Sequence, residues 1–179
     1  ATHKDYYPAT VMNYRLGGGS FASQLTQQLR EGKGYTYGIS SRFNGTAHEG
    51  YFRIGSGIRT NVTYEATSLV KQILEDYGKN YNQEDLDVTK GFTLKSTARA
   101  FETLGAKLNM LSNISNYGLD DDYAKQRQAI VSEMTVEDVK ALAEDYIKPN
   151  QMIYLIVGDA TTQLDKLEGL GFGKPVLLN

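Results

Sequence analysis

The chain has 179 residues, enough for one domain or two very small ones, and no apolar run approaches the roughly 18 residues that span a bilayer. Its formal net charge of −2 argues against a nucleic-acid partner, because such proteins usually carry a basic excess. The absence of cysteine excludes disulfides and thiolate metal sites. With only His3 and His48 to supply imidazoles, a zinc site within this chain is not expected.

Two helices separated by a glycine run are predicted at the start of the chain. Pro8 suits the first turn of a helix that extends to Leu16, and Gly17-Gly18-Gly19 ends it. Ser20 caps a second predicted helix over 21–31. Its apolar residues recur every four positions and predict a buried face, carried by Phe21, Leu25 and Leu29.

Alternating apolar residues then predict an antiparallel hairpin. One face of the first strand carries Tyr35, Tyr37, Ile39 and Phe43, and one face of the second carries Phe52, Ile54 and Ile58. Asn44-Gly45 begins the connection between the strands. His48 lies in this connection, where we expect an exposed loop histidine.

The remainder of the chain predicts several helices and one further strand. The clearest helical stripe runs from Val62 to Tyr77. Thr135-x-x-Asp138 resembles a capping box. Six apolar residues, Met152 to Val157, predict a strand that is buried on both faces and pairs with the hairpin. Further helices are predicted over 83–102, 104–114, 123–132 and 136–146.

This order of elements predicts an α+β fold, in which several helices cover one face of a mainly antiparallel sheet. We expect residues 1–179 to form a single domain. The glycine run does not predict a phosphate site, because a P-loop needs Gly-Lys-Ser/Thr at its end and none follows. A tight junction between two helices is the favoured interpretation of the glycines.

One pair of residues suggests a binding function. Arg30 closes the second predicted helix, and Tyr37 follows on the first strand after a glycine-rich turn. A guanidinium can hold a peptide carbonyl or carboxylate, and a phenol can donate a hydrogen bond to a developing oxyanion. The pattern alone leaves a structural alternative open, in which Arg30 neutralises the helix C-terminus and Tyr37 packs in the sheet.

Five segments resemble the pitrilysin/insulysin family of zinc peptidases, and in particular the C-terminal domain of its shorter bacterial members, which is akin to mitochondrial processing peptidase. The likeness extends from about Tyr7 to Phe172. The segments are Leu16-Gly-Gly-Gly-Ser-Phe-Ala-Ser-Gln-Leu25, Leu29-Arg-Glu-Gly-Lys-Gly-Tyr-Thr-Tyr-Gly-Ile39, Tyr117-Gly-Leu-Asp-Asp-Asp-Tyr123, Met134-Thr-Val-Glu-Asp-Val139 and Tyr154-Leu-Ile-Val-Gly-Asp159.

The resemblance implies a clamshell of two α+β halves around a peptide chamber. In such proteins the N-terminal half holds zinc through an H-x-x-E-H helix, and the C-terminal half carries no metal. The C-terminal half instead supplies an arginine and a tyrosine that contact the substrate backbone near the scissile bond. These positions match Arg30 and Tyr37, so the resemblance implies that they bind substrate, with no catalytic residue or metal ligand in this chain.

This chain has no H-x-x-E-H. The resemblance therefore implies the substrate-binding half of a zinc endopeptidase, with zinc in an N-terminal domain of the same protein or in a partner subunit. The alternative is an inactive peptidase-like subunit or assembly scaffold.

Two features of the chain differ from the family pattern. The family domain usually begins with a strand before its first helix, so we expect a fragment of a longer peptidase that lacks this strand. Gly32 and Tyr35 replace the usual basic and aliphatic residues, which we expect to loosen the turn that aims Arg30.

Overall fold

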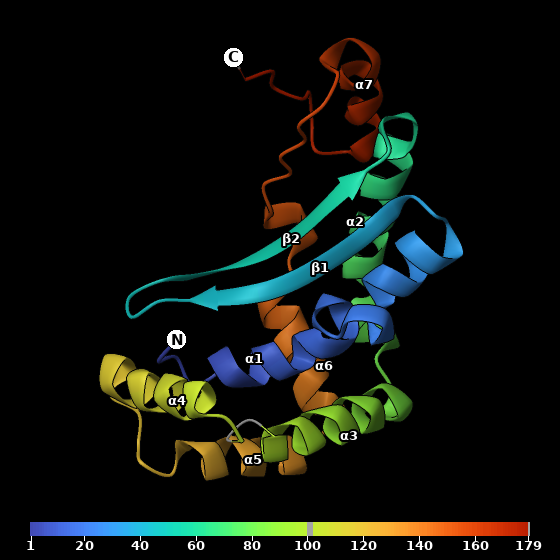
Figure 1. Ribbon diagram of the computed structural model, residues 1–179. Helices are drawn as coiled ribbons and strands as arrows, with labels where there is room; N and C mark the ends of the chain where they lie inside the picture. The colour runs from blue at the N-terminus through green and yellow to red at the C-terminus, as the bar shows by residue number, and fades with distance from the viewer. Residues whose placement is uncertain (100–101, 179) are drawn as a thin grey trace.

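A computed structural model describes residues 1–99 and 102–178 of the chain. The fold is α+β: an antiparallel hairpin of β1 (Thr36–Gly45) and β2 (Gly50–Ile58) lies on a layer of helices (Figure 1). Arg42 of β1 is paired in register with Arg53 of β2. Within the described residues the sheet contains these two strands alone.

Helices both precede and follow the hairpin, as predicted. Phe101, in the helix predicted over 83–102, lies outside the described residues. Within those residues, no helix has the length and hydropathy to cross a membrane. The α-helices are α1 (Tyr6–Asn13), α2 (Thr63–Asn80), α3 (Gln83–Arg99), α4 (Leu104–Tyr117), α5 (Tyr123–Glu133), α6 (Val136–Tyr146) and α7 (Ala160–Leu167). Shorter π-helical or 3₁₀ segments are Tyr14–Gly18, Ser20–Ala22, Thr26–Gly32, Thr60–Val62, Pro149–Gln151 and Glu168–Leu170.

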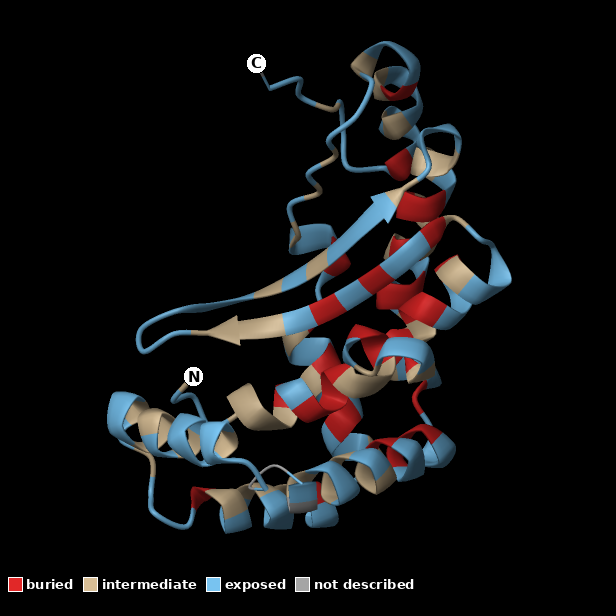
Figure 2. Ribbon diagram, in the orientation of Figure 1, coloured by how far each residue is buried: buried red, intermediate tan, exposed pale blue. Residues whose placement is uncertain are grey.

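The core lies between the hairpin and helices α1, α2 and α6 (Figure 2). The buried hydroxyl of Tyr77 donates a 2.6 Å hydrogen bond to the carbonyl of Met12, so this phenol is paired inside the core. Its burial raises the pKa of Tyr77 well above the usual value. The buried face of α2 is the one that periodicity predicts and comprises Ala66, Thr67, Val70, Ile73, Leu74 and Tyr77.

The predicted capping box at the start of α6 is confirmed. The backbone N–H of Asp138 donates to Thr135 Oγ1 at 3.1 Å, and the N–H of Thr135 donates to Asp138 Oδ2 at 2.8 Å. The hydroxyl of Thr135 also donates to Asp138 Oδ2. These hydrogen bonds stabilise the carboxylate and lower the pKa of Asp138.

The prediction that Met152–Val157 pairs with the hairpin as a doubly buried strand is wrong. The segment is extended but unpaired: Met152, Tyr154 and Ile156 are half-buried, whereas the alternate side chains are exposed, Ile153 to 97%. One face lies along α2, and no described strand lies beside the segment to form a sheet. The apolar run therefore forms a strand-like segment without a neighbour.

The helix predicted over 104–114 is present as α4, but its leucines at helical spacing are not buried. Leu104, Leu108 and Leu111 of α4 are all exposed. The reason is the position of α4, which lies away from the core formed by the hairpin and α2 (Figure 1). Helical periodicity predicts the helix correctly, but does not say what covers its apolar face.

Candidate functional site

The predicted site residues Arg30 and Tyr37 belong to one helix–turn–strand unit on the β1 side of the hairpin. The π-helical segment Thr26–Gly32 is anchored by Leu25 and Leu29, which are fully buried in the core. Arg30 lies on the last turn of this segment, and Tyr37 is the second residue of β1. The buried leucines therefore fix the base from which Arg30 extends.

Backbone hydrogen bonds close the turn between the two residues. The N–H of Tyr35 donates to the carbonyl of Leu29 at 2.8 Å, and that of Gly34 to the carbonyl of Arg30 at 3.0 Å. Gly34 has a φ of +61°, which glycine adopts readily after a helix. The glycine pattern thus produces the sharp turn expected from the sequence. Tyr35 is one of the two residues that differ from the family pattern and that we expected to loosen this turn. Its backbone N–H nevertheless donates one of the hydrogen bonds that close the turn.

A bulge at the start of β1 turns Tyr37 to solvent. The pairing register shifts between Thr36 and Ile39, both of which are buried, whereas Tyr37 is 89% exposed. The prediction that Tyr37 shares a face with Ile39 is wrong, because a bulge reverses the alternation of side chains. The hydroxyl of Thr36 holds the bulge: it donates to the carbonyl of Gly57 at 2.7 Å and accepts from the N–H of Gly38 at 3.0 Å.

The structure brings Arg30 and Tyr37 together. Arg30 Cζ lies 5.2 Å from the ring centroid of Tyr37 and 4.6 Å from that of Phe21, within the range of cation–π attraction. Arg30 Nε also lies 3.3 Å from Glu31 Oε1. The other guanidinium N–H groups have no hydrogen-bond acceptor among residues 1–99 and 102–178. The result is a fixed cation beside two solvent-facing aromatic rings.

Phe21 is the site residue that sequence reasoning missed. Its four-residue spacing from Leu25 and Leu29 predicts a shared buried face, yet Phe21 is exposed. The helix is interrupted there, because Phe21 lies in the 3₁₀ turn Ser20–Ala22 ahead of the π-helical segment. The glycine run directly before Ser20 was the available signal that helical spacing would fail at this position.

The glycine run lies at the tight junction of two helical segments that we expected, where a Cβ atom on Gly17 would lie 2.8 Å from Leu25 Cδ1. It also brings the first of these helices into close contact with β1. A Cβ atom on Gly17 would lie 2.2 Å from Ser41 Oγ and 2.7 Å from the Ser41 backbone nitrogen. Asn13 Nδ2 donates to the Ser41 carbonyl at 2.8 Å and locks the contact. The glycines therefore let the backbone carrying Phe21 approach β1.

A buried ion pair ties the Phe21 turn to α3. Arg15 Nη2 lies 2.7 Å from Asp85 Oδ1, and their side chains are only 15% and 8% exposed. Arg15 also donates to the carbonyl of Ala22, next to Phe21. Because this arginine joins two elements far apart in sequence, it holds the aromatic part of the site in place.

No cluster of three or more His, Cys, Asp or Glu side chains that could hold a metal ion occurs among the residues that the structure describes. His48 is exposed in the hairpin connection, as expected, and His3 is an exposed residue near the N-terminus. The two histidines therefore do not belong to such a cluster in the described part of the chain.

Comparison with known proteins relates this arrangement to one family. Residues 1–91 match the family model of the peptidase M16 inactive domain. A Helicobacter pylori protein named non-peptidase homolog YmxG is 28% identical over 161 residues, which are 87% of this chain and 36% of that protein. A Streptomyces coelicolor protein named uncharacterized zinc protease SCO5738 is 25% identical over 138 residues, 76% of this chain and 30% of that protein. The chain spans about a third of each relative.

Solved structures share the fold. A peptidase M16 inactive domain from Pseudomonas fluorescens superposes with a TM-score of 0.76 at 28% identity, covering 83% of this chain and 35% of that one. A protease from Helicobacter pylori has a TM-score of 0.74 at 21% identity, with 82% and 36% covered. The predicted α+β class is confirmed by these similarities.

Proposed function

Because the chain belongs to the family of peptidase M16 inactive domains, we propose that it supplies the peptide-binding surface of a larger zinc-dependent endopeptidase. The observation that carries the proposal is a cluster of three residues, in which the half-buried guanidinium of Arg30 lies beside the exposed rings of Tyr37 and Phe21. The zinc would be held by an N-terminal domain of the same protein or by a partner subunit.

In this proposal Arg30 binds the peptide backbone. A guanidinium presents several N–H donors in one plane, which suits the carbonyl oxygens of an extended peptide. Contact with the rings of Phe21 and Tyr37 restricts the orientation of that plane. Less conformational entropy is then lost when the peptide binds. Phe21, which is exposed beside Arg30, would also contact an apolar side chain of the peptide.

Tyr37 would act on the scissile carbonyl. The bulge directs its side chain to solvent, so its hydroxyl can donate a hydrogen bond to a carbonyl oxygen that gains negative charge. The metal in the other domain would supply an activated water molecule. This chain's own contribution is to hold the peptide and to stabilise the oxygen of the bond that is cut.

The test is the turnover of a quenched fluorogenic peptide library by the full-length protein. For Tyr37→Phe we expect kcat/KM to fall about 100-fold, the usual cost of one oxyanion donor. Arg30→Ala should lower kcat/KM by at least about tenfold through lost binding. Tyr51→Phe and Arg42→Ala are matched controls, since both are exposed residues on the same hairpin and should keep wild-type turnover. Wild-type turnover in both site variants would contradict the proposal.

A second candidate is an inactive peptidase-like subunit that binds peptide or assembles with a partner without cutting. The name of the Helicobacter pylori relative, a non-peptidase homolog, favours it. The coding sequence upstream of Ala1 separates the two. An H-x-x-E-H motif there supports the peptidase. A full-length gene product that lacks this motif and gives no turnover when combined with a zinc-bearing partner subunit supports the inactive subunit.

A further inference from the structure

A cavity of about 370 Å³ lies among helices α1, α3, α4 and α5, and its volume suits a small ligand. Helix α4, which has no buried residue, lines the cavity with Asn109, Met110 and Asn113. The helix therefore borders an open space instead of packing tightly against its neighbours. This space is called the Arg127 pocket below, after the residue of α5 that lines it.

Arg127 is the one charged residue among the described residues that line the pocket. Its Cζ lies 4.6 Å from the ring centroid of Tyr7 and 4.9 Å from that of Tyr123, so two aromatic rings hold the guanidinium. Among residues 1–99 and 102–178, this guanidinium makes neither an ion pair nor a hydrogen bond. The N–H donors of a half-buried arginine are normally paired, so this cation indicates an anionic ligand.

The groups around Arg127 do not neutralise its charge. Burial raises the pKa of Tyr7, so this phenol stays protonated and uncharged at neutral pH. The carboxylates of Asp120 and Asp122, just before α5, both accept from Gln126 Nε2, at 3.0 and 2.7 Å. Neither carboxylate lines the pocket. The positive charge of Arg127 therefore has no counter-charge within the described lining of the pocket.

Polar but uncharged side chains line much of the remaining wall. The hydroxyls of Ser96 and Thr97 donate to the carbonyl of Thr93 at 2.9 and 2.8 Å, so their oxygens remain able to accept a hydrogen bond. Asn109 and Asn113 carry amides that can both donate and accept. A peptide group offers one N–H and one C=O. The lining therefore suits a peptide group next to a carboxylate.

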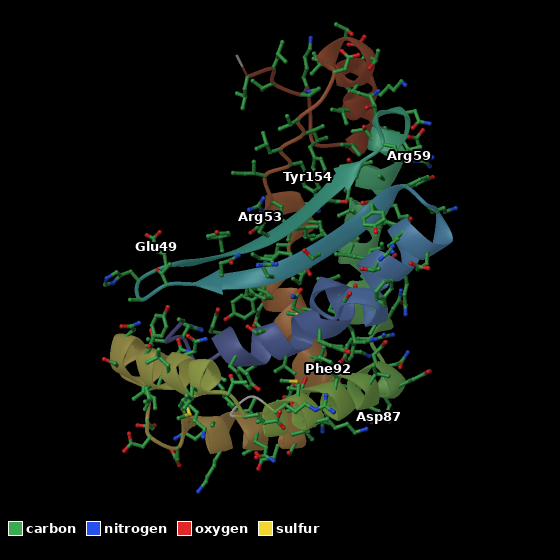
Figure 3. All side chains as sticks on the ribbon, in the orientation of Figure 1. Glu49, Arg53, Arg59, Asp87, Phe92 and Tyr154 are labelled. Carbon is green, nitrogen blue, oxygen red and sulfur yellow. The ribbon has the colours of Figure 1, made fainter. Side chains whose placement is uncertain are left out.

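A second cavity, of about 420 Å³, adjoins the Arg127 pocket, because Tyr7, Thr93 and Ser96 line both. Tyr14 and Phe92 also line this second cavity, and their rings stack with centroids 4.6 Å apart. Phe92, labelled on α3 in Figure 3, is 54% exposed. A ligand whose carboxylate lies at Arg127 can therefore continue as a chain along an aromatic wall.

We propose that the Arg127 pocket binds the C-terminal carboxylate of a peptide whose preceding residues lie against Tyr14 and Phe92. A guanidinium can bind a carboxylate through two parallel N–H···O hydrogen bonds. Its single positive charge balances one carboxylate, whereas a phosphate group with about two negative charges would stay only partly neutralised. Neither Arg30 nor Tyr37 lines either cavity, so this inference is independent of the proposed function.

Binding of a short peptide with and without its terminal charge tests the proposal. The probe is the dye-labelled tripeptide Gly-Phe-Ala, and the readout is its anisotropy with the full-length protein in the presence of a metal chelator. We expect the C-terminal amide of the same tripeptide to bind at least about tenfold more weakly than the free acid. This difference isolates the pocket from any site that binds only backbone groups. Equal Kd values for acid and amide would overturn the proposal.

Substitutions assign the carboxylate to this pocket. Arg127→Ala and Arg127→Lys, which keeps the charge but loses the paired donors, should each weaken binding of the acid at least about tenfold and leave the amide unchanged. Lys125→Ala removes an exposed cation from the same helix and should change neither Kd. Ala124→Leu fills the pocket and should abolish the preference for the acid even if Arg127→Ala fails to fold. A preference for the acid that is lost in Arg30→Ala and kept in Arg127→Lys would refute the proposal.

Competition separates a peptide end from a small organic acid, the other source of a carboxylate. Unlabelled Gly-Phe-Ala should displace the probe at a concentration at least about tenfold lower than butyrate, because butyrate is too short to reach the rings of Tyr14 and Phe92 as well. Phe92→Ala should weaken the tripeptide and leave butyrate unchanged. Displacement by butyrate and tripeptide at the same concentration would contradict a site for the end of a peptide.

Discussion

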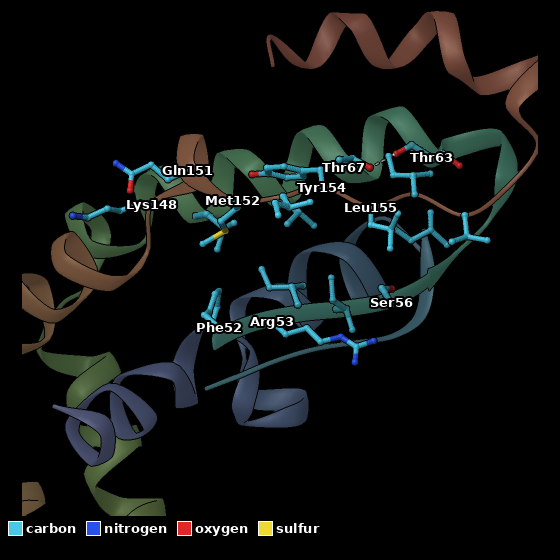
Figure 4. A pocket seen from close by; sticks show the side chains of 18 of the residues that line it. Phe52, Arg53, Ser56, Thr63, Thr67, Lys148, Gln151, Met152, Tyr154 and Leu155 are labelled. Atoms are coloured by element: carbon cyan, nitrogen blue, oxygen red, sulfur yellow. Dashed lines mark hydrogen bonds between the residues drawn. The ribbon is translucent and has the colours of Figure 1, made fainter. Parts of the chain in front are cut away.

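The two sides of the hairpin differ in how completely they are packed. On the β1 side, Gly17 packs so closely against Ser41 that no Cβ atom would fit between them. The Thr26 hydroxyl also donates a hydrogen bond to the carbonyl of Ile39. On the β2 side, half-buried Ile54 and Tyr154 border an open groove between β2 and the segment 152–157 (Figure 4). The same chain thus places the proposed binding cluster on the closely packed side and leaves an open groove on the other.

We expect the largest loss of stability from breaking the buried Arg15–Asp85 ion pair, which ties the Phe21 turn to α3. Asp85→Ala leaves Arg15 charged and buried, which should lower the free energy of unfolding by about 3–5 kcal/mol. Urea denaturation measures this change. The control is Asp76→Ala, which removes the exposed Lys79–Asp76 pair and should change stability by less than about 1 kcal/mol. Equal losses for the two variants would show that the buried pair has no special role.

The second prediction compares the loss of stability when a glycine is replaced by alanine on each side of the hairpin, Gly17 on the β1 side and Gly57 on β2. Gly17→Ala places a Cβ 2.2 Å from Ser41 Oγ and 2.7 Å from a backbone nitrogen, so the contact between helix and β1 must open. We expect a loss of about 2–3 kcal/mol. Gly57→Ala on β2 meets no atom within 4 Å and should change stability by no more than about 0.5 kcal/mol. Similar Tm shifts for the two variants would remove the distinction between the sides.

The smallest effect sets a baseline that involves neither side. Thr135→Ala removes the capping box of α6 and should cost about 1 kcal/mol at neutral pH. Because the folded-state pKa of Asp138 is lowered, its contribution is present above the unfolded-state pKa, near 4, and is lost as pH falls through the folded-state pKa. The stability difference between wild type and variant should therefore shrink below about pH 4. A difference that stays constant into acid would contradict this.

The sequence patterns correctly predicted those features of the fold that depend on interactions between residues close in sequence. The buried face of α2, the capping box and the glycine turn after Arg30 all follow from residues close in sequence. The orientation of the Tyr37 side chain could not be predicted in this way, because the bulge depends on the pairing register between β1 and β2. Phe21 was missed because a 3₁₀ turn interrupts the helical spacing. The run 152–157 was recognised as strand-like, but pairing requires a neighbour that its own residues cannot specify.

In the proposed function, Arg30, held by its aromatic neighbours, binds a peptide backbone. The most direct measurement is the Kd of a dye-labelled peptide of alternating alanine and glycine, which offers little besides backbone, for the full-length protein in the presence of a metal chelator. Arg30→Ala should weaken binding by at least about tenfold, a loss of about 1.4 kcal/mol, while Arg42→Ala leaves the Kd unchanged. The same Kd for wild type, Arg30→Ala and Arg42→Ala would contradict the claim.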